Sequence, residues 1–185
     1  FPTRRSSDLK ANKKATALPK CLSFLALDGL IDAQERRKDN RVPRPIYAEI
    51  DIPALKHNLG VLREKAGDRT LWAVVKANAY GHGLETAVMA FEDADGLATI
   101  DLCDAQRARD AGWKKRILLL EGFFDRTDIE PLQELGVETV IHSPWQIDIL
   151  RSMPLTDVRV HIKVNSGMNR LGFLPIEVNT VWEQL

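Results

Sequence analysis

The sequence predicts an α/β fold in which helices cover a parallel β-sheet. Short runs rich in Val, Ile and Leu alternate with helical patterns from Leu71 onward, and strands of that composition are typical of parallel sheets covered by helices. A chain of 185 residues, 44% of them hydrophobic and 28% charged, is also long enough to bury a sizeable core. We count five strand–helix units, which would form either an open doubly wound sheet or an incomplete barrel.

The first elements follow from capping residues and hydrophobic spacing. Residues 47–50 are predicted to form a short strand. Asp51 is a suitable cap for the next helix, and Pro53 falls in its first turn, where a missing N–H costs nothing. This helix ends at Gly67. Residues 71–75 have the length and β-branching of a strand buried on both faces, and residues 82–92 form the helix of that unit.

The remaining elements alternate in the same way. Gly112 and Gly136 end two of the helices, and Ser143 is the expected cap of a third. The first strand is not followed by G-x-G-x-x-G, so a dinucleotide-binding fold has no specific support. The predicted strands are residues 96–100, 116–120, 137–141 and 158–164, and the predicted helices are residues 104–111, 126–135, 144–153 and 176–185.

Composition narrows the range of partners. Lys and Arg together number 26, and so do Asp and Glu, so the formal net charge is +0 and no global field draws in nucleic acid or an anionic membrane. We find no apolar run of membrane-spanning length and no signal-peptide cleavage site, and therefore expect a cytoplasmic protein. The spacing of His57, His142 and His161 suggests no metal site.

The amino-terminal stretch does not read as part of a folded domain. Residues 1–9 match one reading frame of a common sequencing adapter, and residues 10–41 are rich in charge with weak periodicity. The first methionine is Met89, whereas Val42 would be the translation of a GTG start codon. We therefore expect residues 1–41 to be a non-native leader without ordered structure, made of adapter scar and translated upstream DNA. The folded domain would comprise residues 42–185.

A lysine ends the first buried strand of the predicted sheet. Lys76 is followed by Ala-Asn-Ala-Tyr-Gly-His-Gly, and the carboxyl ends of strands are where α/β proteins keep their chemistry. An isolated strand-end lysine usually turns out to solvent. The same amine in a partly desolvated pocket can instead form a Schiff base or take a proton.

The whole stretch resembles the pyridoxal-phosphate signature of alanine racemases. In that signature a lysine is followed by a small residue, Asn or Asp, another small residue and then Tyr-Gly-His-Gly. Every position of the signature is matched in this sequence. A second motif, Lys163-Val-Asn-Ser-Gly-Met-Asn-Arg170-Leu-Gly, follows the fifth strand and resembles another motif of that family. Smaller matches over residues 118–124 and 142–146 resemble its Gram-negative branch, and we interpret them as packing and loop residues. His82 is expected to be a structural hydrogen-bonding residue.

The resemblance implies an amino-terminal part of a TIM-type (β/α) barrel, about five of eight βα units, of a fold-type III pyridoxal-phosphate enzyme. Lys76 would hold pyridoxal 5′-phosphate as an aldimine and catalyse the interconversion of L-alanine and D-alanine. Tyr80 would contact the cofactor near its phosphate. Arg170 would contact both the cofactor and the substrate carboxylate, and Lys163 would be carbamylated.

The family is further characterised by a homodimer in which the opposing acid–base is a tyrosine from the other subunit. That tyrosine belongs to a carboxyl-terminal β domain, which we expect to lie beyond Leu185. The resemblance thus implies an isomerase that supplies D-alanine as a peptidoglycan precursor, present here as a fragment that is inactive alone. Two alternatives stay open: a pyridoxal-phosphate carrier module, and another fold-type III enzyme such as a decarboxylase or D-serine dehydratase.

Overall fold

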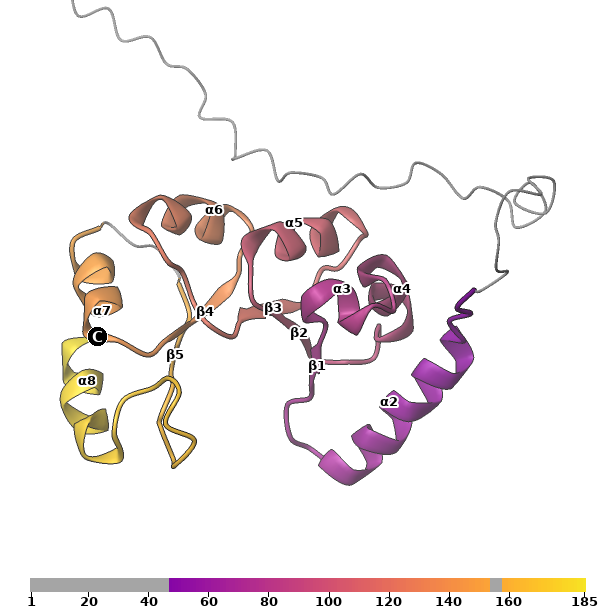
Figure 1. Cartoon of the computed structure of the whole chain (residues 1–185), viewed down its shortest axis with the longest axis horizontal. Helices are drawn as coiled ribbons and strands as arrows, with labels where there is room; N and C mark the ends of the chain where they lie inside the picture. Colours follow the sequence, from indigo (N-terminus) through magenta and orange to yellow (C-terminus); the bar gives the residue numbers. More distant parts are fainter. Residues whose placement is uncertain (1–46, 154–157) are drawn as a thin grey trace, which may run out of the picture. The chain divides into compact units, whose positions relative to one another are not determined.

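The computed structural model describes residues 47–153 and 158–185. A five-stranded sheet forms their centre, and all of its strand pairs are parallel. The strand order is β1-β2-β3-β4-β5, so each strand pairs with the strand that precedes it in the chain (Figure 1). The strands are β1 (Trp72–Val74), β2 (Gly96–Thr99), β3 (Arg116–Leu119), β4 (Glu138–Ile141) and β5 (Val160–Ile162).

This sequential order decides between the two architectures that the sequence leaves open. A doubly wound sheet reverses its strand order at a switch point, whereas a (β/α) barrel adds its strands one after another. The described sheet has no reversal. It is therefore part of a TIM-type barrel, as the resemblance implies, and the doubly wound alternative is wrong.

Helices follow the strands and cover one face of the sheet. In Figure 1, α5 and α6 lie on the same side of the strands that they connect. Helix α2 begins after Asp51, whose side chain accepts a hydrogen bond from the Ala54 amide at 3.0 Å. The helices are α2 (Ile52–Ala66), α4 (Leu84–Ala90), α5 (Leu102–Asp110), η1 (Arg126–Asp128), α6 (Ile129–Glu134), α7 (Pro144–Arg151), η2 (Pro175–Glu177) and α8 (Val178–Gln184).

Side chains alternate between the two faces of the sheet and form two separate apolar clusters. The larger cluster joins the sheet to its helices and includes Leu97, Ile117 and Ile141. Their neighbours along the strands, Ala98, Leu118 and Val140, form a smaller cluster on the opposite face, with Trp72 packed against it. In a barrel that second face is the interior.

The sheet curves enough for its two edge strands to meet across this inner face. Trp72 of β1 and His161 of β5 make an edge-to-face ring contact with centroids 6.4 Å apart. A Cβ atom at Gly96 would overlap the Trp72 ring, so residue 96 must be glycine for the indole to lie there. The strands therefore bend around a shared interior instead of forming a flat sheet.

Some expectations need correction. Residues 47–50 form no strand. The segment 71–75 is not buried on both faces, because Val74 points to the open interior and is 40% exposed while Val75 is 1% exposed. Ser143 precedes α7 as predicted, but its side chain makes no capping hydrogen bond. The predicted leader, residues 1–41, lies outside the described residues. Within the part of the chain that is described, no helix has the length and apolarity needed to cross a membrane.

Candidate functional site

Lys76 follows β1 after one residue, Val75, at the edge of the sheet where all five strands end. Val75 leaves the extended conformation, with φ −123° and ψ 17°, so the chain turns immediately before the lysine. Its side chain is half-buried, and its Nζ lies 6.0 Å from the centre of the Tyr80 ring. The predicted pair is therefore close together in space.

The turn after Lys76 is a left-handed helical turn (α3, Lys76–Tyr80). Ala77, Asn78 and Ala79 have φ values of 52°, 54° and 52° with ψ values of 51°, 48° and 47°. Tyr80 also has a positive φ, of 53°. Four consecutive residues without glycine in this region are unusual, because L-residues normally enter it one at a time. The turn brings the Tyr80 ring back toward the lysine that begins it.

Lys163 occupies the corresponding place at the end of β5. His161 and Lys163 alternate toward the interior, and the Lys163 Nζ donates a hydrogen bond of 2.6 Å to the Leu120 carbonyl, just past β3. Burial lowers the pKa of Lys163, and the nearby positive charges of Arg170 and Lys76 lower it further, while the Glu121 carboxylate acts in the opposite sense. Lys163 therefore lies within electrostatic reach of both other predicted cations.

Arg170 is carried by a loop that returns to the end of β5. The Asn165 side chain holds this loop by accepting hydrogen bonds from the amides of Gly167 and Asn169, at 3.1 and 3.0 Å. Gly172 closes the loop with a φ of 116°, and a Cβ there would lie 2.8 Å from the Asn165 nitrogen. Together with Lys163, the loop lines a hollow of about 190 Å³.

The fold thus places the four residues that the two motifs predict at the same end of the sheet. Lys76 and Tyr80 come from the end of β1, and Lys163 and Arg170 from the end of β5. An amine, two further cations and a phenol at one end of the sheet match pyridoxal phosphate, an aldehyde that carries a phosphate dianion. The chemistry of these donors therefore fits the cofactor.

The smaller family matches have structural roles, as expected. Gln146 is fully buried, accepts from the His142 amide at 2.8 Å and donates to the Phe123 carbonyl at 3.1 Å. Gly122 has a φ of 74°, and a Cβ there would collide with the Val140 carbonyl. His82 places its Nδ1 2.9 Å from the Ala79 carbonyl, within the left-handed turn. The prediction that His82 is a structural residue agrees with this contact.

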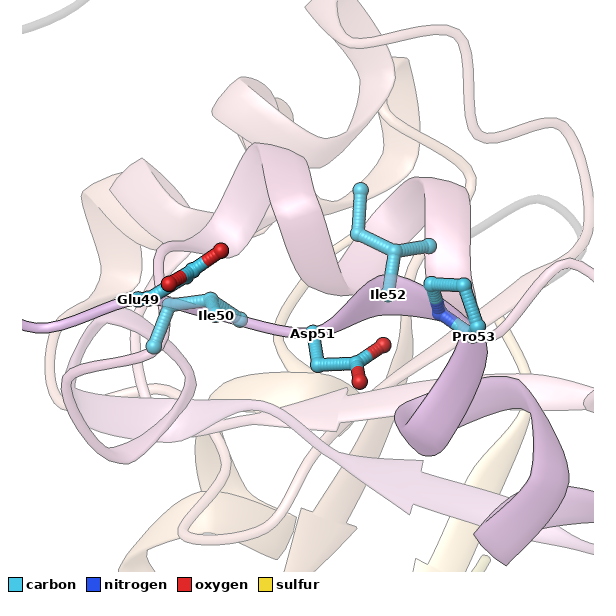
Figure 2. A pocket seen from close by; sticks show the side chains of 5 residues that line it. All are labelled: Glu49, Ile50, Asp51, Ile52 and Pro53. Atoms are coloured by element: carbon cyan, nitrogen blue, oxygen red, sulfur yellow. The ribbon is translucent and has the colours of Figure 1, made fainter. Parts of the chain in front are cut away.

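A second hollow is not a candidate site. It measures about 710 Å³ beside the start of α2, and Figure 2 shows the five consecutive residues that line it: Glu49, Ile50, Asp51, Ile52 and Pro53. The Asp51 carboxylate is already used to cap α2. No set of His, Cys, Asp and Glu side chains that could hold a metal ion occurs in residues 47–153 and 158–185.

Sequence reasoning missed the left-handed turn and the residues that hold it. The Asn78 Oδ1 accepts hydrogen bonds from the Leu84 amide at 3.0 Å and from Arg107 at 3.1 Å. Asn78 itself is a signal, since asparagine tolerates positive φ, but Ala77 and Ala79 give none. The contact with Arg107 on α5 joins residues far apart in the chain, and nothing in the local pattern predicts it.

Comparison with known proteins agrees with this geometry. The family model for the alanine racemase N-terminal domain matches residues 50–185. An alanine racemase from Janthinobacterium sp. (strain Marseille) is 52% identical over 145 residues, which cover 78% of this chain and 40% of that protein. A catabolic alanine racemase from Salmonella typhimurium is 46% identical over 143 residues, covering 77% of this chain and 40% of that protein.

Solved structures give the same result. The biosynthetic alanine racemase from Pseudomonas aeruginosa matches with a TM-score of 0.71 and 37% identity, over 74% of this chain and 38% of that one. The enzyme from Acinetobacter baumannii matches with a TM-score of 0.70 and 33% identity, over 74% of this chain and 39% of that one. The chain spans about 40% of the length of the curated relatives it matches. By its sequence, its partial barrel and the extent of the domain match, the chain belongs to the alanine racemase family of pyridoxal 5′-phosphate enzymes.

Proposed function

We propose that this chain carries the lysine-bearing part of an alanine racemase active site, in which Lys76 binds pyridoxal 5′-phosphate and moves the α-proton of alanine. The observation that supports this most is the gathering of Lys76, Lys163 and Arg170 at the carboxyl end of a curved parallel sheet. Barrel enzymes bind their substrates at that end. Because the chain spans about 40% of its relatives' length, the racemase activity belongs to the whole protein.

Each residue of the site has a distinct task in this proposal. The Lys76 amine would hold the cofactor and, when free, would take a proton from one face of Cα or deliver one to that same face, depending on the direction of the reaction. The Arg170 guanidinium binds the substrate carboxylate, for which its planar fork of donors is suited. Tyr80 lies beside Lys76 and contacts the cofactor near its phosphate. When bound, the cofactor supplies an electron-withdrawing ring that lowers the cost of removing the α-proton.

Lys163 would act as a carbamate. The ammonium first loses a proton, and the neutral amine then adds carbon dioxide by forming an N–C bond and releasing a second proton, so that a cation becomes an anion. The lowered pKa of Lys163, caused by burial and by the neighbouring cations, increases the neutral fraction that can react. The resulting anion would attract the Arg170 guanidinium and would hold it in the position that substrate binding needs.

Racemisation requires a second acid–base on the opposite face of Cα. The only tyrosines of this chain are Tyr47 and Tyr80, and neither belongs to the family motif that supplies that group. The opposing tyrosine would come from the second subunit of a homodimer, in a cytoplasmic enzyme that supplies D-alanine as a peptidoglycan precursor. Neither a membrane nor a nucleic acid is required as a partner.

Covalent trapping of the cofactor tests the proposal. The chain is mixed with pyridoxal phosphate, reduced with borohydride, digested and analysed by mass spectrometry. We expect one dominant adduct, on Lys76, that disappears in Lys76→Ala and persists in Lys56→Ala, a control on α2. L-Alanine and D-alanine should both displace the cofactor from Lys76 before reduction, and L-serine less so. Equal labelling of many lysines, or labelling unaffected by Lys76→Ala, would contradict the proposal.

A further inference from the structure

The left-handed turn after Lys76 needs support from outside itself. A left-handed conformation is sterically unfavourable for an L-residue, and Ala77, Asn78, Ala79 and Tyr80 all adopt it. Hydrogen bonds within the turn, such as the 2.8 Å bond from the Ala79 amide to the Val75 carbonyl, do not explain its hand. A right-handed turn of the same length would form equivalent bonds without the steric cost.

The outside support converges on the Asn78 side chain. Its Oδ1 accepts from the Leu84 amide at the start of α4 and from the Arg107 Nη2 on α5, at 3.0 and 3.1 Å. These two bonds tie the middle of the turn to two helices that are part of the packed layer. A right-handed turn would redirect the Asn78 side chain and lose both.

Arg107 is itself fixed on two further sides. Its Nη2 lies 2.9 Å from the Glu85 Oε1 on α4, and its Nη1 donates to the Asp104 Oδ1 at 3.1 Å. Asp104 is buried and accepts from the Thr99 hydroxyl at 3.3 Å, at the end of β2. The guanidinium is thereby oriented toward Asn78 from a rigid part of the sheet and helix layer.

A simpler explanation is that Arg107 only pairs with Glu85 to join α5 to α4. Both side chains are substantially exposed, 41% and 55%, and such pairs contribute little to stability. The contact with Asn78 is not needed for that pairing. A guanidinium can reach Asn78, Glu85 and Asp104 together because its donors point in different directions, and a lysine ammonium on a single flexible stem cannot replace it.

We propose that Arg107 is a positioning residue, which holds the left-handed turn through Asn78 and thereby sets the positions of Lys76 and Tyr80. Only the purpose of this positioning rests on the proposed function. The mechanical link between Arg107 and the turn can be tested with no cofactor present.

Amide hydrogen exchange in the cofactor-free chain tests that link. The variants are Arg107→Met and Arg107→Lys, and Arg109→Met is the matched control, because Arg109 lies on the same helix but donates to the Leu135 and Trp113 carbonyls instead. The quantity measured is the protection of the Ala79 and Leu84 amides relative to that of Ile117 in β3. Ile117 reports any loss of global stability, so the comparison separates such a loss from one confined to the turn.

We expect Arg107→Met to lower the ratio about fivefold, the effect of about 1 kcal/mol acting on the turn alone. Arg107→Lys should behave like Arg107→Met, and Arg109→Met should leave the ratio unchanged. An unchanged ratio in Arg107→Met, or its full restoration by lysine, would overturn the proposal, since a simple charge pair with Glu85 would then suffice.

Cofactor trapping separates this proposal from the proposed function. If the wild-type chain captures pyridoxal phosphate on Lys76, Arg107→Met should slow that capture and Arg109→Met should not, because only the first variant loosens the turn that carries Lys76 and Tyr80. Capture that is slowed equally by Arg109→Met would overturn the positioning role. If the wild-type chain fails to capture the cofactor, the proposed function fails, and the exchange ratio still decides whether Arg107 holds the turn.

Discussion

The two ends of the barrel interior differ in how their charged side chains are paired. Opposite charges contact each other at the amino ends of the strands, whereas cations lie near one another at the carboxyl ends. At the amino ends of the strands, the buried Glu138 accepts from Arg116 at 2.7 Å and lies 2.7 Å from the His161 Nε2. The Arg116 guanidinium also lies 4.6 Å from the centre of the Trp72 ring. At the carboxyl ends, Arg170 and Lys76 act on Lys163 as like charges, while the Glu121 carboxylate acts on it in the opposite sense. Among the residues that the structure describes, these three cations form no ion pair with a carboxylate.

This difference matches the division between residues that stabilise the fold and residues to which the proposed function assigns a ligand. Opposite charges that satisfy one another stabilise the folded chain, at least against loss of either partner. Like charges kept together destabilise it and persist where function needs them. The electrostatics of Lys163 therefore support the proposal that the carboxyl end is the reactive end.

The largest change in the free energy of unfolding is expected at the amino ends of the strands, where Glu138 is paired with cations. Glu138→Gln removes the only buried carboxylate in contact with Arg116 and His161 among the described residues, and should lower the free energy of unfolding by about 3 kcal/mol. Urea denaturation measures this. Glu130→Gln, at an exposed position of α6, is the control and should change little. If both variants lowered the free energy of unfolding equally, the buried charge pairs of Glu138 would not stabilise the fold more than an exposed glutamate does.

A smaller change in the free energy of unfolding, of opposite sign, is expected at the carboxyl ends of the strands. Lys163→Met keeps the apolar stem but removes a half-buried charge that faces Arg170 and Lys76. It should raise the free energy of unfolding by about 1 kcal/mol, because the folded state no longer holds that cation. Lys114→Met, at an exposed site, is the control for the same urea experiment. A destabilised Lys163→Met would mean that the bond to Leu120 outweighs the repulsion.

The smallest effects are expected in the pH dependence of stability. Burial opposes ionisation of Glu138, but its hydrogen bonds with Arg116 and His161 prevail and lower its pKa. Its contribution is present above the ordinary value of about 4.3 and is lost as the pH falls through the folded pKa.

Lys163 has a lowered pKa because of burial, so in the window below its ordinary value of about 10.4 the unfolded state binds more protons and stability rises with pH. Thermal melts across pH should therefore show an acid slope that Glu138→Gln reduces and an alkaline rise that Lys163→Met removes. An acid slope unchanged in Glu138→Gln would assign it to the other carboxylates with lowered pKa values, such as Asp95.

Much of the fold could be predicted from sequence because hydrophobic runs and capping residues determine strands and helices locally. The five strands, the cap of α2 and the lysine at the end of β1 follow from hydrophobic runs, Asp51 and the position of Lys76. Residues 47–50 were mistaken for a strand because an apolar run does not reveal whether a partner strand is present. Val74 was expected to be buried because alternation does not tell a filled interior from an open one.

The site was less predictable than the fold. The motifs identify Lys76, Tyr80, Lys163 and Arg170, but their proximity depends on the curvature that brings β1 and β5 together. The contact between Arg107 and Asn78 depends on the docking of α5 against α4, and no local pattern encodes it. Long-range packing therefore determines how the motif residues lie relative to one another, which the motifs alone do not predict.

The strand order has a consequence for how this chain is made. Because each strand pairs with the strand before it, every new strand leaving the ribosome finds its partner already present, and contacts stay short in sequence. A doubly wound sheet, by contrast, must leave room for strands that are made later. In this chain β1 and its lysine are made first, and they acquire the Lys163 neighbour only when β5 has emerged. Synthesis thus builds the sheet progressively and completes the cationic cluster last.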